Sequence, residues 1–299
     1  MLAGTALIVA GVAAFFAFNW AALHRLAKFG LLEAGIAASV FLAWWRGLDS
    51  LAGRAALVCA SFLTGVLLAV YGQAYQTGAD AYGLFLGWGV LILGWALIGR
   101  QGALWLLVAV LANLTLVLYW GQVLHPPAAF IEDLAHAFGP FSWIGYLLSD
   151  SQLAHLVFGL NGAILIVWEL GACAGVAWMR GRWFPRLIAL FALAAISDAA
   201  LLRILTANLG VGGELQFIAP LLFAVFVASA LWYYQTREQD LFILAACLLA
   251  TIVVVTALVA RSLMGGFDAL LLLSMLVVAQ TAGAAAWLRS VAQSWRVAT

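Results

Sequence analysis

A polar stretch, Tyr71–Tyr82, lies between two long apolar runs and concentrates hydrogen-bonding side chains. Its hydroxyls, amides and single carboxylate can donate or accept hydrogen bonds, while Gly72 and Gly78 permit backbone conformations that other residues resist. This chemistry suits the binding of a polar solute, and it matches no known catalytic motif. We therefore predict an outward-facing polar pocket formed by five side chains: Gln73, Tyr75, Gln76, Thr77 and Asp80.

The spacing within this stretch also predicts local structure. Tyr71 and Tyr75 are four residues apart, so both rings lie on one side if the preceding helix continues through them. Gly78 would then end that helix, and Asp80 would cap the next one by accepting a hydrogen bond from the amide of Gly83 or of a nearby residue. Asp80 has two possible roles, capping alone or contact with a ligand, and the sequence leaves both open.

Two carboxylates, Glu169 and Asp198, lie deep within apolar segments. A charge in the hydrocarbon region costs about 2.5–3.5 kcal/mol on insertion scales, so each needs a partner, a proton or a polar cavity. One interpretation is structural: Asp198 pairs with Arg203, and Glu169 is protonated or hydrogen-bonded to a residue such as Asn113. The alternative interpretation is a proton or cation relay that uses Glu169, Asp198 and Arg203.

Motifs typical of enzymes are missing from the sequence. There is no glycine-rich phosphate loop, nucleophile elbow or paired-histidine zinc motif. The three cysteines, Cys59, Cys173 and Cys247, lie singly in apolar runs and are typical of small packed residues. We therefore expect no catalytic residue, no metal and no cofactor.

The composition indicates the class of protein. Hydrophobic residues make up 67% of the 299 residues and charged residues 8%, against about 25% charged residues in soluble domains. The lipid bilayer is therefore the expected surrounding. A formal net charge of +1 gives no reason to expect a nucleic-acid partner. A small-molecule ligand fits the polar stretch, and the sequence identifies no protein partner.

Ten apolar segments are long enough to cross a bilayer, which takes about 20 residues as a helix. We predict an all-α integral membrane bundle, because every backbone amide in lipid must be paired within its own segment. The organisation is a five-span N-terminal half (1–121), an outer connection (122–151) and a five-span C-terminal half (152–299). The ten segments are 2–20, 29–45, 54–72, 81–99, 102–121, 152–178, 183–203, 216–234, 241–260 and 267–288.

The basic residues predict the orientation. With ten spans and a cytoplasmic N-terminus, nine of the 13 lysines and arginines fall on the cytoplasmic side and four on the other. Cytoplasmic connections are enriched in such residues, so we expect both termini in the cytoplasm. The connection 122–151 then lies outside. It contains an amphipathic pattern over Ala128–Phe138, which predicts a short interfacial helix that either covers the bundle or contacts a substrate.

Several short motifs of the first 121 residues resemble a family of bacterial predicted inner-membrane proteins of unknown function. The most specific is a Gly-Gln-x-Tyr-x-Thr-Gly-Ala-Asp-like segment between two spans. The resemblance implies a place in the bacterial inner membrane, and it assigns no reaction. The matching residues are Asn19, Trp20, Arg25, Gly72, Gln73, Tyr75, Thr77, Gly78 and Asp80.

Three classes of function agree with these observations. The first is a transporter or permease for a small solute or proton, suggested by ten spans and buried carboxylates. The second is a non-catalytic assembly or envelope-maintenance factor. The third is a membrane enzyme that acts on a lipid-linked substrate.

Overall fold

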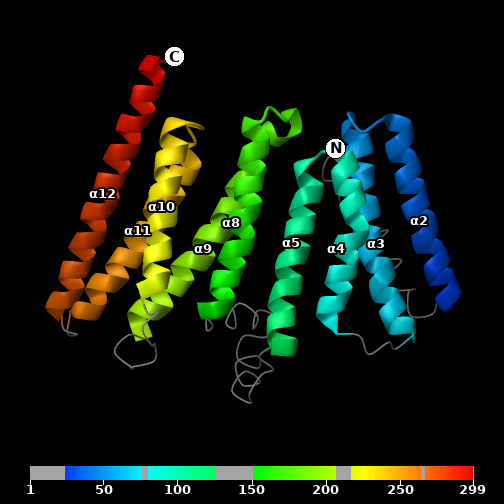
Figure 1. The fold of residues 1–299 in the computed structure, drawn as a ribbon, viewed down its shortest axis with the longest axis horizontal. Coiled ribbons are helices and arrows are strands. Elements are labelled where there is room, and N and C mark those ends of the chain that lie inside the picture. The colour runs from blue at the N-terminus through cyan, green and yellow to red at the C-terminus, as the bar shows by residue number, and fades with distance from the viewer. Residues whose placement is uncertain (1–23, 76–79, 125–150, 207–216, 264–266, 299) are drawn as a thin grey trace. The chain divides into compact units, whose positions relative to one another are not determined.

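The computed structural model describes residues 24–75, 80–124, 151–206, 217–263 and 267–298. Within these ranges the chain is helical with short turns, and none of it forms a strand. Nine helices in the same ranges are long and apolar enough to cross a membrane (Figure 1). This confirms the predicted all-α architecture. The predicted span at 2–20 and the predicted helix at 128–138 lie outside the described residues.

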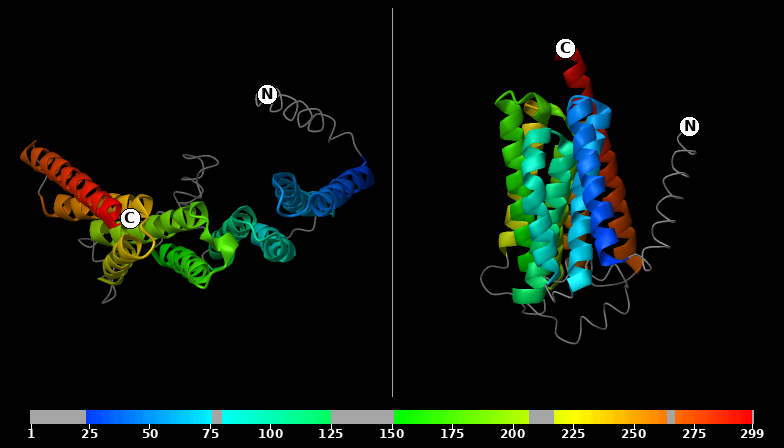
Figure 2. Two further views of the ribbon diagram at one scale, coloured as in Figure 1. Left: turned by 90° about the horizontal axis from the view of Figure 1, so that it is seen from above. Right: turned by 90° about the vertical axis from the view of Figure 1, so that its right-hand side faces the viewer.

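The chain divides into two compact units, Met1–Leu118 and Tyr119–Thr299. The helices α2 (Arg25–Arg46), α3 (Leu51–Tyr75), α4 (Ala81–Gly99) and α5 (Gly102–Tyr119) come first. The second unit continues with η1 (Trp120–Leu124), α8 (Ser151–Cys173), η3 (Ala177–Arg180), α9 (Trp183–Thr206), α10 (Ile218–Thr236), α11 (Leu241–Ser262) and α12 (Phe267–Ala298). Within each unit, consecutive long helices run in alternating directions (Figures 1 and 2).

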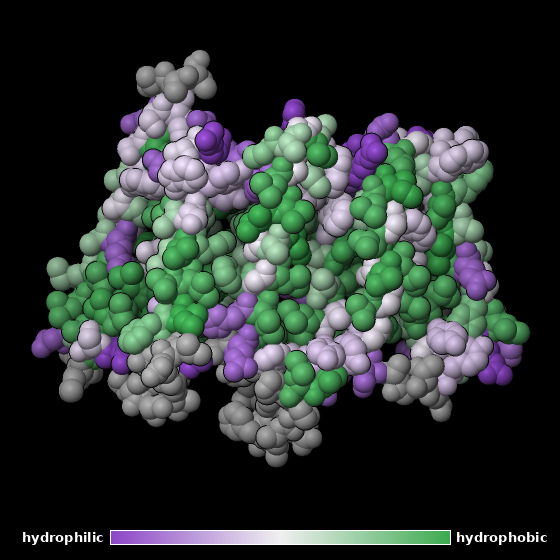
Figure 3. Space-filling model, viewed as in Figure 1, coloured by the Kyte–Doolittle hydropathy of each residue, from purple (hydrophilic) through white to green (hydrophobic). Residues whose placement is uncertain are grey.

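The outer surfaces of these helices are apolar along their middle parts. In the space-filling view, hydrophobic side chains cover the middle of the visible helices and hydrophilic residues gather toward their ends (Figure 3). This distribution is expected where the middle of each helix faces lipid and its ends face water.

In the first unit, α3 packs against both α2 and α4. The ring of Trp88 on α4 lies directly against Gly65 on α3, where a β-carbon would collide with it. The indole Nε1 of Trp88 also donates to the carbonyl oxygen of Ser61 over 2.8 Å. A small residue therefore allows these two helices to approach closely, as is common between membrane helices.

In the second unit, α9 is the central helix and packs against α8, α10 and α11. One side of α9 is closed to solvent: Ile188, Ala192, Ile196 and Ala199 are each at most 1% exposed. Their spacing of three or four residues places them on one helical face. The last helix, α12, packs mainly against α11.

The end of α8 differs from the predicted span 152–178. The helix ends at Cys173, and Gly175 adopts a left-handed φ of 85°. The amide of Val176 bonds to the carbonyl oxygen of Gly171, and that of Gly175 bonds to Ala172, at 3.1 Å each. This pair of bonds is a Schellman motif, which stops a helix and favours glycine at the left-handed position. The chain therefore turns back toward α9 earlier than the apolar run suggested.

Candidate functional site

The aromatic residues of the first predicted site lie as the spacing predicted. Helix α3 continues through Tyr71 and Tyr75, and their ring centroids are 4.7 Å apart. Both rings also contact Phe29 of α2, with centroid distances of 6.4 and 6.1 Å. The prediction that both rings lie on one side of a continuous helix is confirmed.

The remaining residues of that site are less closely associated. Gln73, Tyr75 and Asp80 are exposed, whereas Gln76 and Thr77 lie outside the described residues. The side chain of Asp80 makes no capping hydrogen bond. Its backbone oxygen accepts from the amide of Gly83 at 3.0 Å instead, so the predicted side-chain cap is wrong. The backbone carbonyl supplies the partner that the carboxylate was expected to provide.

Glu169 lies in the last turn of α8, and its residue is 7% exposed. The hydroxyl of Tyr234 donates to Oε1 at 2.8 Å, and Nη1 of Arg182 donates to Oε2 at 3.0 Å. Both carboxylate oxygens are therefore bound. Arg182 and Tyr234 take the place that the sequence interpretation gave to Asn113, whose amide donates to the carbonyl oxygen of Ala109.

Arg182 joins Glu169 to two further carboxylates. Its Nε lies 3.3 Å from Oδ2 of Asp240, and its Nη1 lies 3.4 Å from Oε2 of Glu238. Arg186 binds the same Asp240 oxygen at 2.9 Å. We call these five residues, Glu169, Arg182, Arg186, Glu238 and Asp240, the charged cluster; it links α8, the start of α9 and the α10–α11 connection.

Asp240 is the structural centre of the charged cluster. Its side chain is 1% exposed, and its Oδ1 accepts from the amide of Phe242 at 3.1 Å. It is thus the N-cap of α11 as well as the partner of two arginines. Aspartate suits both tasks, because a carboxylate satisfies a free amide at a helix start and pairs with guanidinium groups.

The charged cluster shifts the pKa values of Asp240 and Arg182, which lie outside the spanning helices. Burial alone would raise the pKa of Asp240, but the hydrogen bond and charge of Arg186 outweigh it and lower that pKa below its ordinary value. Burial alone would lower the pKa of Arg182, but the hydrogen bond and charge of Glu169 raise it above the ordinary value. Asp240 and Arg182 are therefore held in their charged forms.

Asp198, the other predicted carboxylate, is half-buried on α9. None of the four ion pairs between described residues joins it to Arg203. Five residues along a helix correspond to a rotation of about 140°, so the two side chains leave the helix in different directions. The predicted Asp198–Arg203 pair is therefore not formed.

A groove of about 600 Å³ runs between α8 and α10, and Glu169 lies at its polar end. Gly159 and Gly162 on α8 help to leave this space open, since a β-carbon at either position would meet no atom within 4 Å. Glu169 is the only charged residue among the described residues that line the groove. Other lining residues are Phe158, Cys173, Phe226, Tyr233 and Tyr234.

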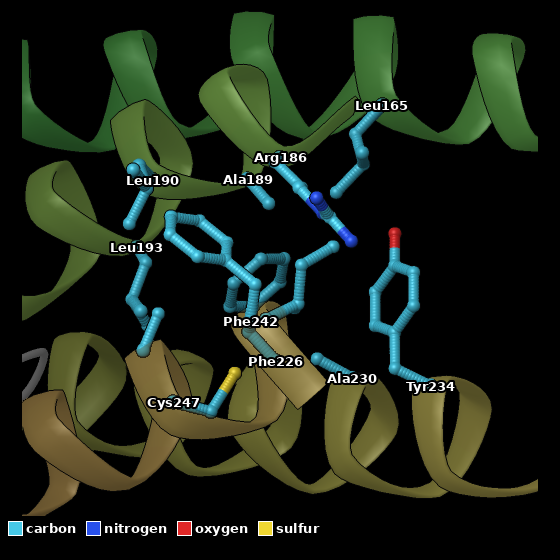
Figure 4. A pocket seen from close by; sticks show the side chains of 12 residues that line it. Leu165, Arg186, Ala189, Leu190, Leu193, Phe226, Ala230, Tyr234, Phe242 and Cys247 are labelled. Atoms are coloured by element: carbon cyan, nitrogen blue, oxygen red, sulfur yellow. The ribbon is translucent and has the colours of Figure 1, made fainter. Parts of the chain in front are cut away.

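A second cavity, enclosed by α8 to α11, is much smaller. Figure 4 shows Arg186 and Tyr234 beside it, with Phe242 and Cys247 among the other lining residues. Its volume is about 10 Å³, which is at most the space of one water molecule. The groove between α8 and α10 is large enough for a small organic molecule, since ligand sites span about 300–1,000 Å³. A further pocket of about 320 Å³ between α11 and α12 is also within that range, but no charged residue is among the described residues that line it.

The sequence interpretation missed most of the charged cluster. Arg182 and Arg186 entered it only as charges that set the orientation, and Glu238, Asp240 and Tyr234 were not considered as site residues. One local signal was available: Asp240 immediately precedes an apolar run, which is typical of a helix N-cap. Within the described ranges, no group of three or more His, Cys, Asp and Glu side chains is placed to hold a metal ion.

A bundle of apolar helices with the length to cross a bilayer defines a multi-spanning membrane protein. Residues 1–105 match the family model described as "Predicted membrane protein (DUF2157)". This match, over about a third of the chain, confirms the predicted resemblance to a membrane family of unknown function. No curated protein and no solved structure matches the chain.

Proposed function

We propose that the protein is a transporter for a small solute, with the groove between α8 and α10 as its solute site. The observation that carries this proposal is Glu169, which borders the groove on a spanning helix and is bound by Arg182 and Tyr234. Carboxylates within membrane helices are costly, and they commonly mark solute, ion or proton paths. The groove provides the space and Glu169 provides the group that can take up a proton.

The charged cluster supports coupling between a proton and the solute. When Glu169 is neutralised, Arg182 still has Asp240 at 3.3 Å and Glu238 at 3.4 Å as partners. Protonation of Glu169 therefore does not leave the half-buried Arg182 without a counter-ion, which would be destabilising. Arg182 would therefore keep a counter-ion in a second arrangement without Glu169, and a ligand that prefers that arrangement would shift the balance toward it.

We infer that this transporter lies in the bacterial inner membrane with both termini and the charged cluster on the cytoplasmic side. The support is the nine-to-four distribution of lysine and arginine, which includes Arg182 and Arg237 in the connections of the second unit. In a variant without native cysteines, Thr77→Cys and Ala135→Cys should react with an impermeant thiol reagent added outside. Gly181→Cys should not, and the reverse pattern would contradict this orientation.

Uptake into proteoliposomes tests the transporter proposal. The full chain is reconstituted, pH gradients of either sign are imposed, and four labelled probes are offered: an organic cation, an amino acid, a sugar and inorganic phosphate. We expect gradient-driven accumulation of at least one probe, and its loss in Glu169→Gln. The matched control is Asp198→Asn, a half-buried carboxylate outside the groove, which should keep wild-type uptake.

Two results would contradict the proposal. The first is that no probe accumulates above the level of protein-free liposomes. The second is equal uptake by the wild type and Glu169→Gln. A stoichiometric protein partner without uptake would favour the assembly factor, and turnover of a lipid would favour the enzyme.

A further inference from the structure

The groove between α8 and α10 has a single kind of charge at its surface. Glu169 lines it, and no lysine or arginine is among the described residues that do so. The rest of the lining is apolar or aromatic, apart from the hydroxyl groups of Ser229, Tyr233 and Tyr234 and the thiol of Cys173. Such a surface favours a positive charge at one end of a ligand and apolar groups along the rest.

We infer that the groove binds an amphipathic organic cation, which replaces Arg182 at the Glu169 carboxylate. This inference deepens the proposed function, on which it rests, by naming the class of solute. The ligand's cationic centre would lie at Oε2 of Glu169, and its apolar body would lie between α8 and α10.

The charge balance of the cluster is consistent with this exchange. Its three carboxylates and two guanidinium groups leave one negative charge in excess when all five are ionised. A monovalent cation neutralises that excess, whereas an anion increases it. Charge complementarity thus selects against anionic ligands, because a like charge in such a site is repelled.

Arg182 can leave Glu169 without losing its other partners. Asp240 and Glu238 lie within 3.4 Å of its guanidinium group. Its Nη2 atom is buried and makes no hydrogen bond within the described part of the chain, so the present position does not satisfy all of its donors. A small movement toward Asp240 and Glu238 would free Oε2 of Glu169 for the ligand.

Aromatic rings along the groove would add to ligand binding, with Tyr234 bonded to Glu169 at one end. Tyr233 and Tyr234 lie edge to face with centroids 5.0 Å apart, and Phe158 and Phe226 pack in the same way at 5.2 Å. Ring faces attract cations, and they also pack against apolar groups. The four rings come from α8 and α10, the two helices that border the groove.

Binding of two probes of similar shape and opposite charge tests the inference. The full chain in lipid nanodiscs is titrated with benzyltrimethylammonium, a cation with its charge at one end, and phenylmethanesulfonate, an anion of similar shape, and binding to empty nanodiscs is subtracted. We expect saturable binding of the cation and much weaker binding of the anion. In Glu169→Gln the Kd for the cation should rise about tenfold or more, the effect of losing a charge-assisted contact.

Two further variants separate a binding role from a structural one. Gly162→Phe would fill the groove without a collision at its β-carbon and should abolish cation binding in a folded protein. Its matched control is Gly94→Phe on α4, where a β-carbon also meets no atom within 4 Å and binding should persist. Arg182→Gln should tighten cation binding, because it removes the competitor for Glu169. If Arg182 had only a structural role, its removal would not tighten cation binding.

Equal affinities for the two probes would overturn the inference, as would unchanged cation binding in Glu169→Gln and Gly162→Phe. Its failure can be distinguished from failure of the proposed function. Cation binding without uptake of any probe would retain the binding site and reject the transporter. Glu169-dependent uptake of an anionic or neutral probe, without cation binding, would retain the transporter and reject the cation.

Discussion

Nε of Arg186 lies 2.9 Å from Oδ2 of Asp240 and ties the first turn of α9 to the start of α11. The other oxygen, Oδ1, accepts from the amide of Phe242. One buried carboxylate thus starts a helix and holds two arginines near Glu169. The order of the charged cluster therefore depends on Asp240.

Substitution of Asp240 should destabilise the second unit in two separable steps. Asp240→Asn keeps a capping side chain but leaves two partly exposed arginines without their shared counter-ion. The loss should be smaller than that of a fully buried pair, about 3–5 kcal/mol, because solvent screens the arginines. Asp240→Ala should cost about 1 kcal/mol more, because it also removes the cap. Denaturant unfolding in detergent measures both. The matched control, Asp268→Asn in the exposed first turn of α12, should be nearly neutral, and an equal effect there would contradict this role.

The stability of the protein should decrease in acid because of Asp240. Its pKa is lower in the folded state than the ordinary value of 3.8. The contribution of this carboxylate is therefore complete above pH 3.8, and it is lost as the pH falls through the folded-state pKa. Melting temperatures measured from pH 7 down to acid should show this loss in the wild type and a smaller one in Asp240→Asn. Parallel curves for the two proteins would contradict the assignment.

Alkaline pH should not produce a matching loss through Arg182. The pKa of Arg182 is raised above its ordinary value, so the guanidinium stays charged throughout the usual pH range. Its contribution to folding stability is fully present below the unfolded-state pKa and therefore persists at working pH.

Removal of the Tyr234 hydroxyl should weaken both stability and solute uptake. Tyr234→Phe deletes the 2.8 Å hydrogen bond and leaves Oε1 of Glu169 without that donor. The cost should be about 1–3 kcal/mol, because an unsatisfied buried acceptor is expensive. The matched control is Tyr233→Phe, whose hydroxyl makes only a 3.4 Å contact with Sγ of Cys173. Unfolding and proteoliposome uptake of the two variants should differ, and equal behaviour would contradict a specific role for Tyr234.

Gly175 should be required for the turn that follows α8. Its φ of 85° is strained for any residue with a β-carbon, so Gly175→Ala should destabilise the protein by about 1 kcal/mol or more. Gly181→Ala is the matched control, since that glycine has a φ of −64° and its β-carbon would meet only an ordinary contact. Thermal unfolding compares them, and a neutral Gly175→Ala would show that the turn tolerates strain.

The amino-acid sequence was sufficient to predict the nine long helices of the described residues. A long apolar run predicts a spanning helix without knowledge of the rest of the fold, because each spanning helix must pair its own backbone amides. The placement of Tyr71 and Tyr75 on one side of α3 is local in the same sense, since it depends only on helical spacing. The apolar run did not predict where α8 ends. The left-handed Gly175 stops the helix, although the apolar sequence continues beyond it.

The partners of Glu169 depend on packing between distant segments. The sequence showed that a deep carboxylate needs a partner and offered Asn113 as an example, whereas Arg182 was counted only among the charges that set the orientation. Arg182 reaches Glu169 because the turn at Gly175 reverses the chain after α8. Tyr234 reaches Glu169 because α8 and α10 both pack against α9 and border the same groove. Which side chains meet across helices is set by the geometry of packing, and composition and spacing along one chain do not contain that information.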